Sequence, residues 1–185
     1  MISKNSKVIV LDRDGVINLE SDDYIRSPDE WIPIEGSIEA IAALNKNNFR
    51  ILIATNQSGL ARGYFDEYDL ANIHSKCCSM VEDSGGFISA IFFCPHLPDD
   101  KCACRKPKTG LLKQAETELE ISLAGSFFVG DSEKDLETAL AFNMAPILVR
   151  TGKGHNTESN LNEELRKSTA IFDDLKSAVS WILVQ

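Results

Sequence analysis

The sequence predicts a doubly wound parallel α/β sheet. Short apolar runs typical of buried strands alternate along the chain with segments whose apolar residues recur with the helical period. Because strands separated by helices are joined by right-handed crossovers, this alternation favours parallel strands covered by helices on both faces. Polar residues directly follow the predicted strands. Since the carboxyl ends of parallel strands share one edge of the sheet, we expect a ligand site there.

The composition is that of a soluble globular protein, and we expect one domain over residues 1–185. Hydrophobic residues make up 43% of the 185 residues and charged residues 25%. A net charge of −9 without a basic run argues against nucleic acid or a membrane surface as partner. No apolar run approaches the ~20 residues of a membrane span, and no signal-peptide core is present. We therefore expect a cytoplasmic monomer that acts on a small molecule.

The first predicted strand carries the most informative motif. Val8 to Leu11 are four consecutive β-prone apolar residues, as expected for a strand buried on both faces. Asp12 and Asp14 follow with i, i+2 spacing, and Gly15 then permits a sharp turn. Two carboxylates on one face repel each other unless a cation lies between them or one is protonated. The motif alone therefore fits a metal site and an Asp-rich turn that caps the strand about equally well.

The remaining elements follow the same alternation. His74 and Cys77 lie on the apolar stripe of the second helix, so we expect both to be core residues. Ser37 is predicted to be the N-cap of the first helix, and Asp66 that of the second. Strands are predicted over 50–55, 90–94, 127–130 and 146–149, helices over 37–46, 67–84, 109–119, 133–142 and 175–182, and polar loops over 18–33 and 151–162.

The residues at the strand ends supply the parts that hydrolysis of a phosphate monoester requires. Asp12 can attack phosphorus and form an aspartyl-phosphate. Asp14, which we expect to hold a proton next to the Asp12 charge, can protonate the leaving alkoxide and later activate water. We expect Mg²⁺ to be held by the carboxylates of Asp12 and Asp131 and by the backbone carbonyl of Asp14.

Three further residues complete the predicted catalytic set. Thr55 and the backbone amide of Asn56 can hold a phosphoryl oxygen. Lys106 can supply the positive charge that balances the transition state. Asp135, four residues after Asp131, can support both the metal shell and that lysine.

This constellation resembles the haloacid dehalogenase superfamily of phosphohydrolases. The resemblance rests on four motifs in order: Asp12 to Gly15, Thr55-Asn56, Lys106 and 130–135. It implies a Rossmann-like sheet of the haloacid dehalogenase type without a large cap domain, and Mg²⁺-dependent phosphatase activity. Val16 stands where the superfamily usually has threonine, and we expect a lost hydroxyl contact without loss of activity.

A second cluster lies in the loop over residues 94–104. Cys94, His96, Cys102 and Cys104 match a closed tetrahedral Zn²⁺ site without an open position for catalysis. The alternative is a set of free thiols on a surface loop. Because Arg105-Lys106 follow directly, a loop clamped by zinc would also hold two cations that face the substrate.

The zinc loop and the segment 57–63 resemble the heptose bisphosphate phosphatases of this superfamily, over most of the chain to about Gly154. This resemblance implies removal of the 7-phosphate of D-glycero-D-manno-heptose 1,7-bisphosphate, on the way to the nucleotide-activated heptose of bacterial lipopolysaccharide. Ser132 replaces a lysine that is frequent in the family. The residues expected to contact this phosphosugar are Arg13, Glu20, Ser21, Asp22, Asp23, Tyr24, Asn56, Gln57, Ser58 and Arg105.

Three alternatives remain open at this point. Histidinol-phosphate phosphatases share the zinc loop, and the short spacing between His96 and Cys102 suits them as well. A nucleic-acid 3′-phosphatase would share the first motif, but the acidic balance of the chain argues against it. A phosphosugar-binding module without catalysis would have no need of two intact aspartates and the lysine.

Overall fold

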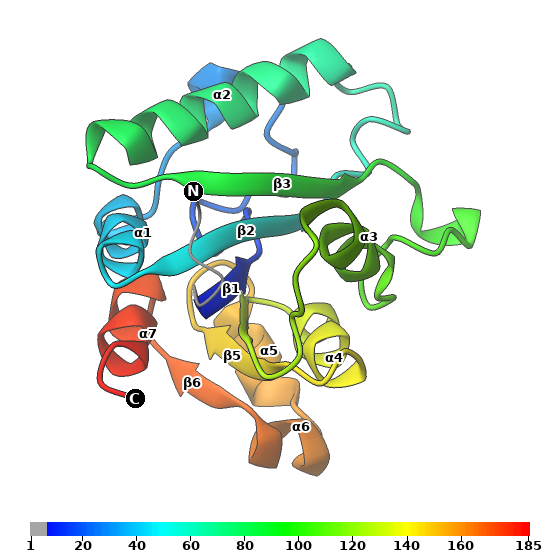
Figure 1. The fold of residues 1–185 in the computed structure, drawn as a ribbon. Coiled ribbons are helices and arrows are strands. Elements are labelled where there is room, and N and C mark those ends of the chain that lie inside the picture. Colours follow the sequence, from blue (N-terminus) through cyan, green and yellow to red (C-terminus); the bar gives the residue numbers. More distant parts are fainter. Residues whose placement is uncertain (1–6) are drawn as a thin grey trace.

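The computed structural model describes residues 7–185 and contains a six-stranded parallel sheet in the order β3-β2-β1-β4-β5-β6 (Figure 1). The doubly wound prediction is therefore confirmed. The strand order reverses at β1, which pairs with β2 on one side and with β4 on the other. The strands are β1 Lys7–Leu11, β2 Phe49–Asn56, β3 Ile88–Cys94, β4 Phe127–Gly130, β5 Ala145–Val149 and β6 Ala170–Phe172.

Helices cover both faces of the sheet. In Figure 1, α1, α2 and α7 lie on one side, and α3 and α4 lie on the other. The helices are α1 Ser37–Lys46, α2 Glu67–Asp83, α3 Gly110–Leu119, α4 Glu133–Ala141, α5 Gly154–Asn160, α6 Glu163–Ser168 and α7 Leu175–Ile182, with short 3-10 turns at η1 Pro28–Glu30 and η2 Pro98–Asp100. Within residues 7–185, no helix is both long and apolar enough to cross a bilayer.

The central strand is buried on both faces, as its apolar run predicts. Ile9 and Leu11 belong to the core cluster beneath α1, α2 and α7. Val10 belongs to the opposite cluster, with Leu112 of α3 and Ala139 of α4. Because both faces are covered by apolar side chains, polar groups can reach β1 at the strand end alone.

Helix α2 begins with a capping box and supports the loop before α1. The side chain of Asp66 accepts from the Asp69 amide, and the side chain of Asp69 accepts from the Asp66 amide. On the face toward the loop over residues 18–33, Lys76 Nζ donates to the backbone oxygens of Pro28 and Trp31. Since Trp31 is also fully buried, this loop is anchored against the core.

Two local predictions are wrong. The N-cap of α1 is Gly36, whose φ is +80°, whereas the Ser37 hydroxyl is turned inward and donates to the backbone oxygen of Ile17 at 2.7 Å. Residues 151–162 are not a simple loop, because they contain helix α5. Thr157 in this helix donates its hydroxyl to the backbone oxygen of Asp131, a tertiary contact that the polar sequence does not announce.

Candidate active site

A cavity of about 520 Å³ opens at the carboxyl ends of β1, β2 and β4, where the strand order reverses. It collects most of the residues that the sequence analysis assigned to catalysis and substrate binding. The lining residues are Asp12, Asp14, Glu20, Ser21, Asp22, Tyr24, Ile25, Thr55, Asn56, Gln57, Ser58, Arg105, Lys106, Asp131, Ser132, Glu133, Lys134 and Lys153.

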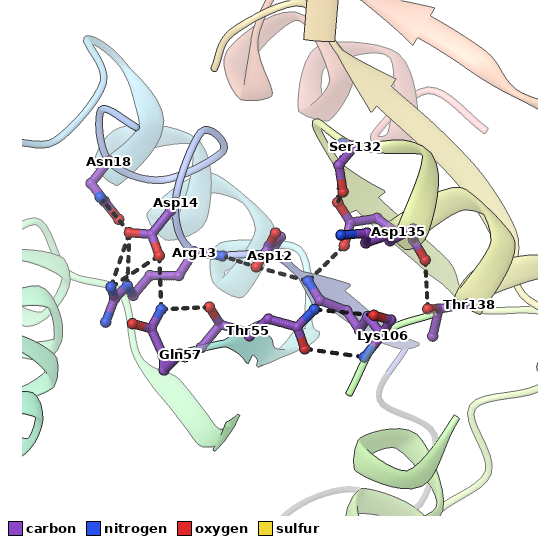
Figure 2. Close-up of polar contacts among 12 residues, drawn as sticks. Asp12, Arg13, Asp14, Asn18, Thr55, Gln57, Lys106, Ser132, Asp135 and Thr138 are labelled. Atoms are coloured by element: carbon purple, nitrogen blue, oxygen red, sulfur yellow. Dashed lines mark hydrogen bonds and ion pairs between the residues drawn. The ribbon is translucent and has the colours of Figure 1, made fainter. Parts of the chain in front are cut away.

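Lys106 joins two of the predicted carboxylates (Figure 2). Its Nζ atom lies 2.9 Å from Oδ1 of Asp12 and 2.6 Å from Oδ1 of Asp135. The lysine side chain is almost fully buried. Burial alone would lower the pKa of Lys106, but the charges of Asp12 and Asp135 raise it above its ordinary value. The ammonium group therefore stays charged at the end of β1.

Hydrogen bonds from Asn56 and Ser132 orient Lys106 and its partner Asp135. The Asn56 side chain accepts from the backbone amide of Lys106 at 3.0 Å and donates to its carbonyl at 3.2 Å, which ties the end of β2 to the Lys106 loop. At the start of α4, the Ser132 hydroxyl donates to Oδ2 of Asp135 at 2.6 Å. Oδ1 of Asp135 is thereby left to face Lys106.

Asp12, Asp131 and Asp135 form a group of carboxylates suited to a metal ion. Their oxygen atoms lie within 4.8 Å of one another. Burial, reinforced by the neighbouring carboxylates, raises the pKa of Asp12 to about 7 and that of Asp131 to about 8, because one lysine does not balance three negative charges. A hard divalent cation with oxygen ligands fits this excess of buried negative charge.

The approach to Asp131 depends on two glycines. Gly15 and Gly152 have φ values of +79° and +56°, and a Cβ atom on either would lie 2.1 to 2.2 Å from Oδ2 of Asp131. That same oxygen accepts from the backbone amide of Lys153 at 2.8 Å. The tight turn after β1 and the connection after β5 therefore close around the carboxylate.

Asp14 lies apart from the carboxylate group, in a set of hydrogen-bond donors shown on the left of Figure 2. Arg13 donates from Nε at 3.1 Å and from Nη2 at 3.0 Å, Asn18 donates at 2.9 Å and Gln57 at 2.8 Å. Burial raises the pKa of Asp14, but the Arg13 charge and these hydrogen bonds outweigh it and hold the pKa below its ordinary value.

The prediction that the Asp12 charge keeps a proton on Asp14 is therefore wrong for this structure. The two aspartates are near each other in sequence, but the side chain of Arg13 folds back onto Asp14 and supplies the nearest charge. The sequence pattern shows the spacing of the carboxylates but not the direction of the intervening arginine.

Two of the predicted substrate residues lie outside the cavity lining. Arg13 is 1% exposed and lies behind Asp14, where its Nη1 atom is 3.2 Å from Nε2 of His74. Asp23 is exposed on the loop over residues 18–33 and does not line the cavity. His74, predicted to be a plain core residue, is half-buried and contacts Arg13, and burial lowers its pKa to about 3.

Five lining residues were not among the predicted site residues. Ile25 extends the predicted substrate loop by one position, and Ser132, Glu133 and Lys134 lie within the fourth motif, where no role in the site was predicted for them. Lys134 and Lys153 add two cations to the cavity, and the Lys153 ammonium forms an ion pair with Glu20. Lys153 follows β5, so the rule that strand ends carry the site could have identified it.

The second predicted cluster is also brought together. The Sγ atom of Cys94 lies 3.7 Å from that of Cys102 and 3.3 Å from that of Cys104, and Nδ1 of His96 lies 3.2 Å from Sγ of Cys104. A tetrahedron with Zn–S bonds of about 2.3 Å has edges of roughly 3.8 Å. Since burial raises the pKa of the Cys94 thiol to about 12, a nearby cation is needed to hold a thiolate there.

Comparisons with known proteins agree with this geometry. Residues 103–178 match the family model described as HAD-hydrolase-like. The chain is 51% identical to D-glycero-beta-D-manno-heptose-1,7-bisphosphate 7-phosphatase of Pseudomonas aeruginosa over 176 residues, which are 95% of this chain and 97% of that protein. The same enzyme of Bordetella bronchiseptica is 45% identical over 96% of this chain and 98% of that protein.

Solved structures give the same result. The crystal structure of the D,D-heptose 1,7-bisphosphate phosphatase from B. bronchiseptica, complexed with magnesium and phosphate, matches with a TM-score of 0.90 and 45% identity over 96% of this chain and 98% of that chain. The corresponding protein of Burkholderia thailandensis has a TM-score of 0.75 and 38% identity, and the match covers 97% of this chain and 100% of that chain. With relatives this similar along nearly its whole length, the chain belongs to the family of heptose 1,7-bisphosphate 7-phosphatases among the HAD-like hydrolases.

Proposed function

We propose that this chain is a Mg²⁺-dependent phosphatase that removes the 7-phosphate of D-glycero-β-D-manno-heptose 1,7-bisphosphate. The products would be inorganic phosphate and heptose 1-phosphate, which serves the synthesis of nucleotide-activated heptose for the lipopolysaccharide core. The observation that carries the proposal is the set of Asp12, Lys106, Asp131 and Asp135 at the reversal of the strand order, in a chain of this family.

In the first step, a carboxylate oxygen of Asp12 attacks phosphorus and forms an aspartyl-phosphate. The bond between phosphorus and the sugar oxygen breaks, and Asp14 gives its proton to the leaving alkoxide. A bound phosphate carries about −1.5 to −2 charges, which raises the pKa of Asp14 and supplies the reason for its protonation once substrate is bound. In the second step, Asp14 takes a proton from water, which attacks the aspartyl-phosphate and releases phosphate.

The remaining polar groups of the cavity neutralise and orient the phosphate. Lys106 faces the nucleophile and balances the charge that develops on the equatorial oxygens. Thr55 and the backbone amide of Asn56 hold one phosphoryl oxygen. Asp12, Asp131 and the backbone carbonyl of Asp14 would hold Mg²⁺, with Asp135 beside them. When bound, this ion supplies positive charge to the transferring phosphoryl group.

The rest of the substrate would face the loop over residues 20–24 and the cations at the cavity rim. Arg105 is held by a hydrogen bond from Nη1 to the backbone oxygen of His96 at 3.2 Å. Lys134 and Lys153 also line the cavity. These side chains suit the distal phosphate and the sugar hydroxyls, because that phosphate must find local positive charge in a protein of net charge −9.

The cysteine cluster is proposed to hold one structural Zn²⁺. Three thiolates and one imidazole leave no position for a catalytic water. The loop that carries them leads directly into Arg105 and Lys106, so the metal would stabilise the placement of both cations. The monomeric state, the cytoplasmic location and the single domain over residues 1–185 stay predictions.

Two alternatives can be separated from this proposal by one assay. Initial rates of phosphate release are measured with both anomers of heptose 1,7-bisphosphate and with histidinol phosphate, in the presence of Mg²⁺. We expect the β-anomer to have the highest kcat/KM. A higher kcat/KM for histidinol phosphate would favour a histidinol-phosphate phosphatase, and binding without turnover would favour a phosphosugar-binding module.

A further inference from the structure

We propose that His74 is a positioning residue for the proton-transfer group Asp14, acting through the buried guanidinium of Arg13. This inference rests on the proposed phosphatase function, in which Asp14 protonates the leaving oxygen. His74 lies 61 positions from Arg13 in the sequence and comes from helix α2, outside the four motifs. Through this contact, helix α2 affects the position of Arg13 and hence that of Asp14.

The guanidinium of Arg13 is divided between two partners. Its Nε and Nη2 atoms donate to the carboxylate of Asp14 at 3.0 to 3.1 Å, and its Nη1 atom lies 3.2 Å from Nε2 of His74. A guanidinium group has donors and no acceptor, so Nε2 must accept and the ring proton lies on Nδ1. Nε2 of His74 is thus the hydrogen-bond acceptor on the side of the guanidinium opposite Asp14.

Burial makes this acceptor important. Arg13 is 1% exposed, and a buried donor without a partner loses the hydrogen bonds that water would have given it, so the guanidinium needs an acceptor at Nη1. His74 itself has little freedom, because its helix neighbours Ile73 and Cys77 are fully buried and the Phe93 ring lies at a centroid distance of 6.1 Å. The ring therefore fixes the plane of the guanidinium and, with it, the direction from which Asp14 is held.

The orientation of Asp14 matters for one part of the reaction. A sugar alkoxide is a strong base and needs a proton from Asp14 as the phosphorus–oxygen bond breaks, whereas 4-nitrophenolate is a weak base and leaves without one. A misplaced Asp14 should therefore slow the release of alkyl leaving groups and spare aryl leaving groups. A general loss of structure would slow both.

The test compares His74→Met, which removes the acceptor, with His74→Gln, which keeps an oxygen acceptor near the position of Nε2. For each, kcat/KM is measured with heptose 1,7-bisphosphate and with 4-nitrophenyl phosphate, because this constant includes the step in which the leaving group departs. General acid catalysis contributes about 10²–10⁴-fold, and loosening the acid without removing it should cost part of that. We expect His74→Met to lose about 10-fold on the sugar substrate and less than about 2-fold on the aryl substrate, and His74→Gln to recover most of the sugar activity.

Equal losses on both substrates, wild-type activity of His74→Met, or a failure of His74→Gln to recover activity would each overturn the inference. Cys78→Ala, a half-buried change on the same helix, is the matched control and should leave both constants unchanged. If His74→Met does not fold, as judged by its melting curve, Arg13→Lys replaces it. A lysine ammonium cannot reproduce the planar group that donates to Asp14 from Nε and Nη2 and to His74 from Nη1, so the same selective loss is expected and an equal loss counts against the proposal.

Wild-type turnover separates this inference from the proposed function. If the wild type does not hydrolyse the heptose bisphosphate, the proposed substrate is wrong, and the variants are compared on the alkyl phosphate that the wild type hydrolyses fastest. If it hydrolyses no phosphate monoester, both proposals fail. If it hydrolyses the bisphosphate and the variants show no selective loss, the inference alone fails.

Discussion

Single side chains at the end of β1 have different tasks because they have different neighbours. Asp12 faces Lys106 and the two other carboxylates, whereas Asp14 is held by Arg13, Asn18 and Gln57. Two aspartates separated by one residue thereby acquire opposite pKa shifts, upward for Asp12 and downward for Asp14. The proposed roles need the reverse order, with Asp12 ionised as the nucleophile and Asp14 protonated as the acid, and bound Mg²⁺ and phosphate would shift the two pKa values in those directions.

Asp12→Asn should abolish turnover. An amide neither attacks phosphorus nor binds Mg²⁺ well, and the change also removes one of the two partners of the Lys106 ammonium. Phosphate release from the bisphosphate measures the effect, with Asp14→Asn as the comparison, for which we expect a loss of about 10²–10⁴-fold. Wild-type activity of a purified Asp12→Asn protein would contradict the nucleophilic role.

Substitution of the neighbouring cations Arg105 and Lys106 should change different kinetic constants. Lys106 is buried against Asp12, so Lys106→Ala should lower kcat on every substrate. Arg105 is held at the cavity rim by the backbone of His96, so Arg105→Ala should raise KM for the bisphosphate.

The measurement for this pair is the ratio of kcat/KM between the bisphosphate and a monophosphate such as fructose 6-phosphate. Arg105→Ala should reduce that ratio, whereas Lys106→Ala should leave it unchanged. If Arg105→Ala slows both substrates by the same factor, Arg105 serves the chemistry and not the selection of substrate.

Among the elements, the connection from β3 to α3 contains both the proposed zinc ligands and two cations of the cavity. It contains the cysteine cluster and ends in Arg105-Lys106, and Asn56 of β2 binds the backbone of Lys106 from the other side. The active-site lysine is therefore placed by a loop with two attachments, one to a neighbouring strand and one to the proposed metal.

We expect one Zn²⁺ per chain that survives dialysis, whereas Mg²⁺ must be added for activity. The double change Cys102→Ser plus Cys104→Ser should remove the zinc and lower both the melting temperature and kcat, because the loop before Lys106 loses its clamp. Elemental analysis of both proteins is the measurement, and Cys78→Ser, on a cysteine outside the cluster, is the matched control. Zinc absent from the wild type, or retained by the double variant, would refute the site.

The connection from β5 to α5 shows how an element can depend on the fold. Its sequence is polar and predicts a loop, yet α5 forms and donates from Thr157 to the backbone of Asp131. The backbone amide of Lys153 orients the same aspartate. The contacts of this helix are with β5 and with Asp131, directly after β4, and no local sequence pattern predicts them.

For the whole molecule, the buried carboxylates link stability, pH and metal. Asp12 and Asp131 have folded-state pKa values of about 7 and about 8 against an ordinary value of 3.8. At these two carboxylates the folded protein binds more protons than the unfolded chain between about pH 4 and about pH 8, so without Mg²⁺ they lower the free energy of unfolding as the pH rises through this window. His74, with its pKa lowered to about 3, opposes this trend below about pH 6.5.

Mg²⁺ should relieve this repulsion, and it should do so most at high pH, where it does not compete with protons for the carboxylates. We expect millimolar Mg²⁺ to raise the melting temperature more at about pH 8 than at about pH 5.5. Thermal melting of the dialysed protein with and without the ion measures this, and Asp131→Asn should reduce the difference between the two pH values. A Mg²⁺ effect that is the same at both pH values would contradict the linkage.

The sequence by itself determined the strands β1 to β5, the helices α1 to α4 and α7, and the place of the site. Apolar runs predict the buried strands. Because the strands are parallel, the polar residues after Leu11, Ala54 and Gly130 lie at the same edge of the sheet, where the strands have their carboxyl ends. Cys94, His96, Cys102 and Cys104 could likewise be grouped in advance, because their ligand chemistry is distinctive and their separation in the chain is short.

Only the tertiary structure decided how the charged side chains pair. Arg13 was expected to contact the substrate, but it turns inward to Asp14 and His74, and this changes the resting charge of Asp14. Asn56 was expected to hold a phosphoryl oxygen through its backbone amide, whereas the use of its side chain, which binds the backbone of Lys106, came from the structure alone. Local patterns report which residues share a face or a strand end. The direction of a long side chain depends on burial and on partners 43 to 61 residues away, which are known only once the sheet and α2 are packed together.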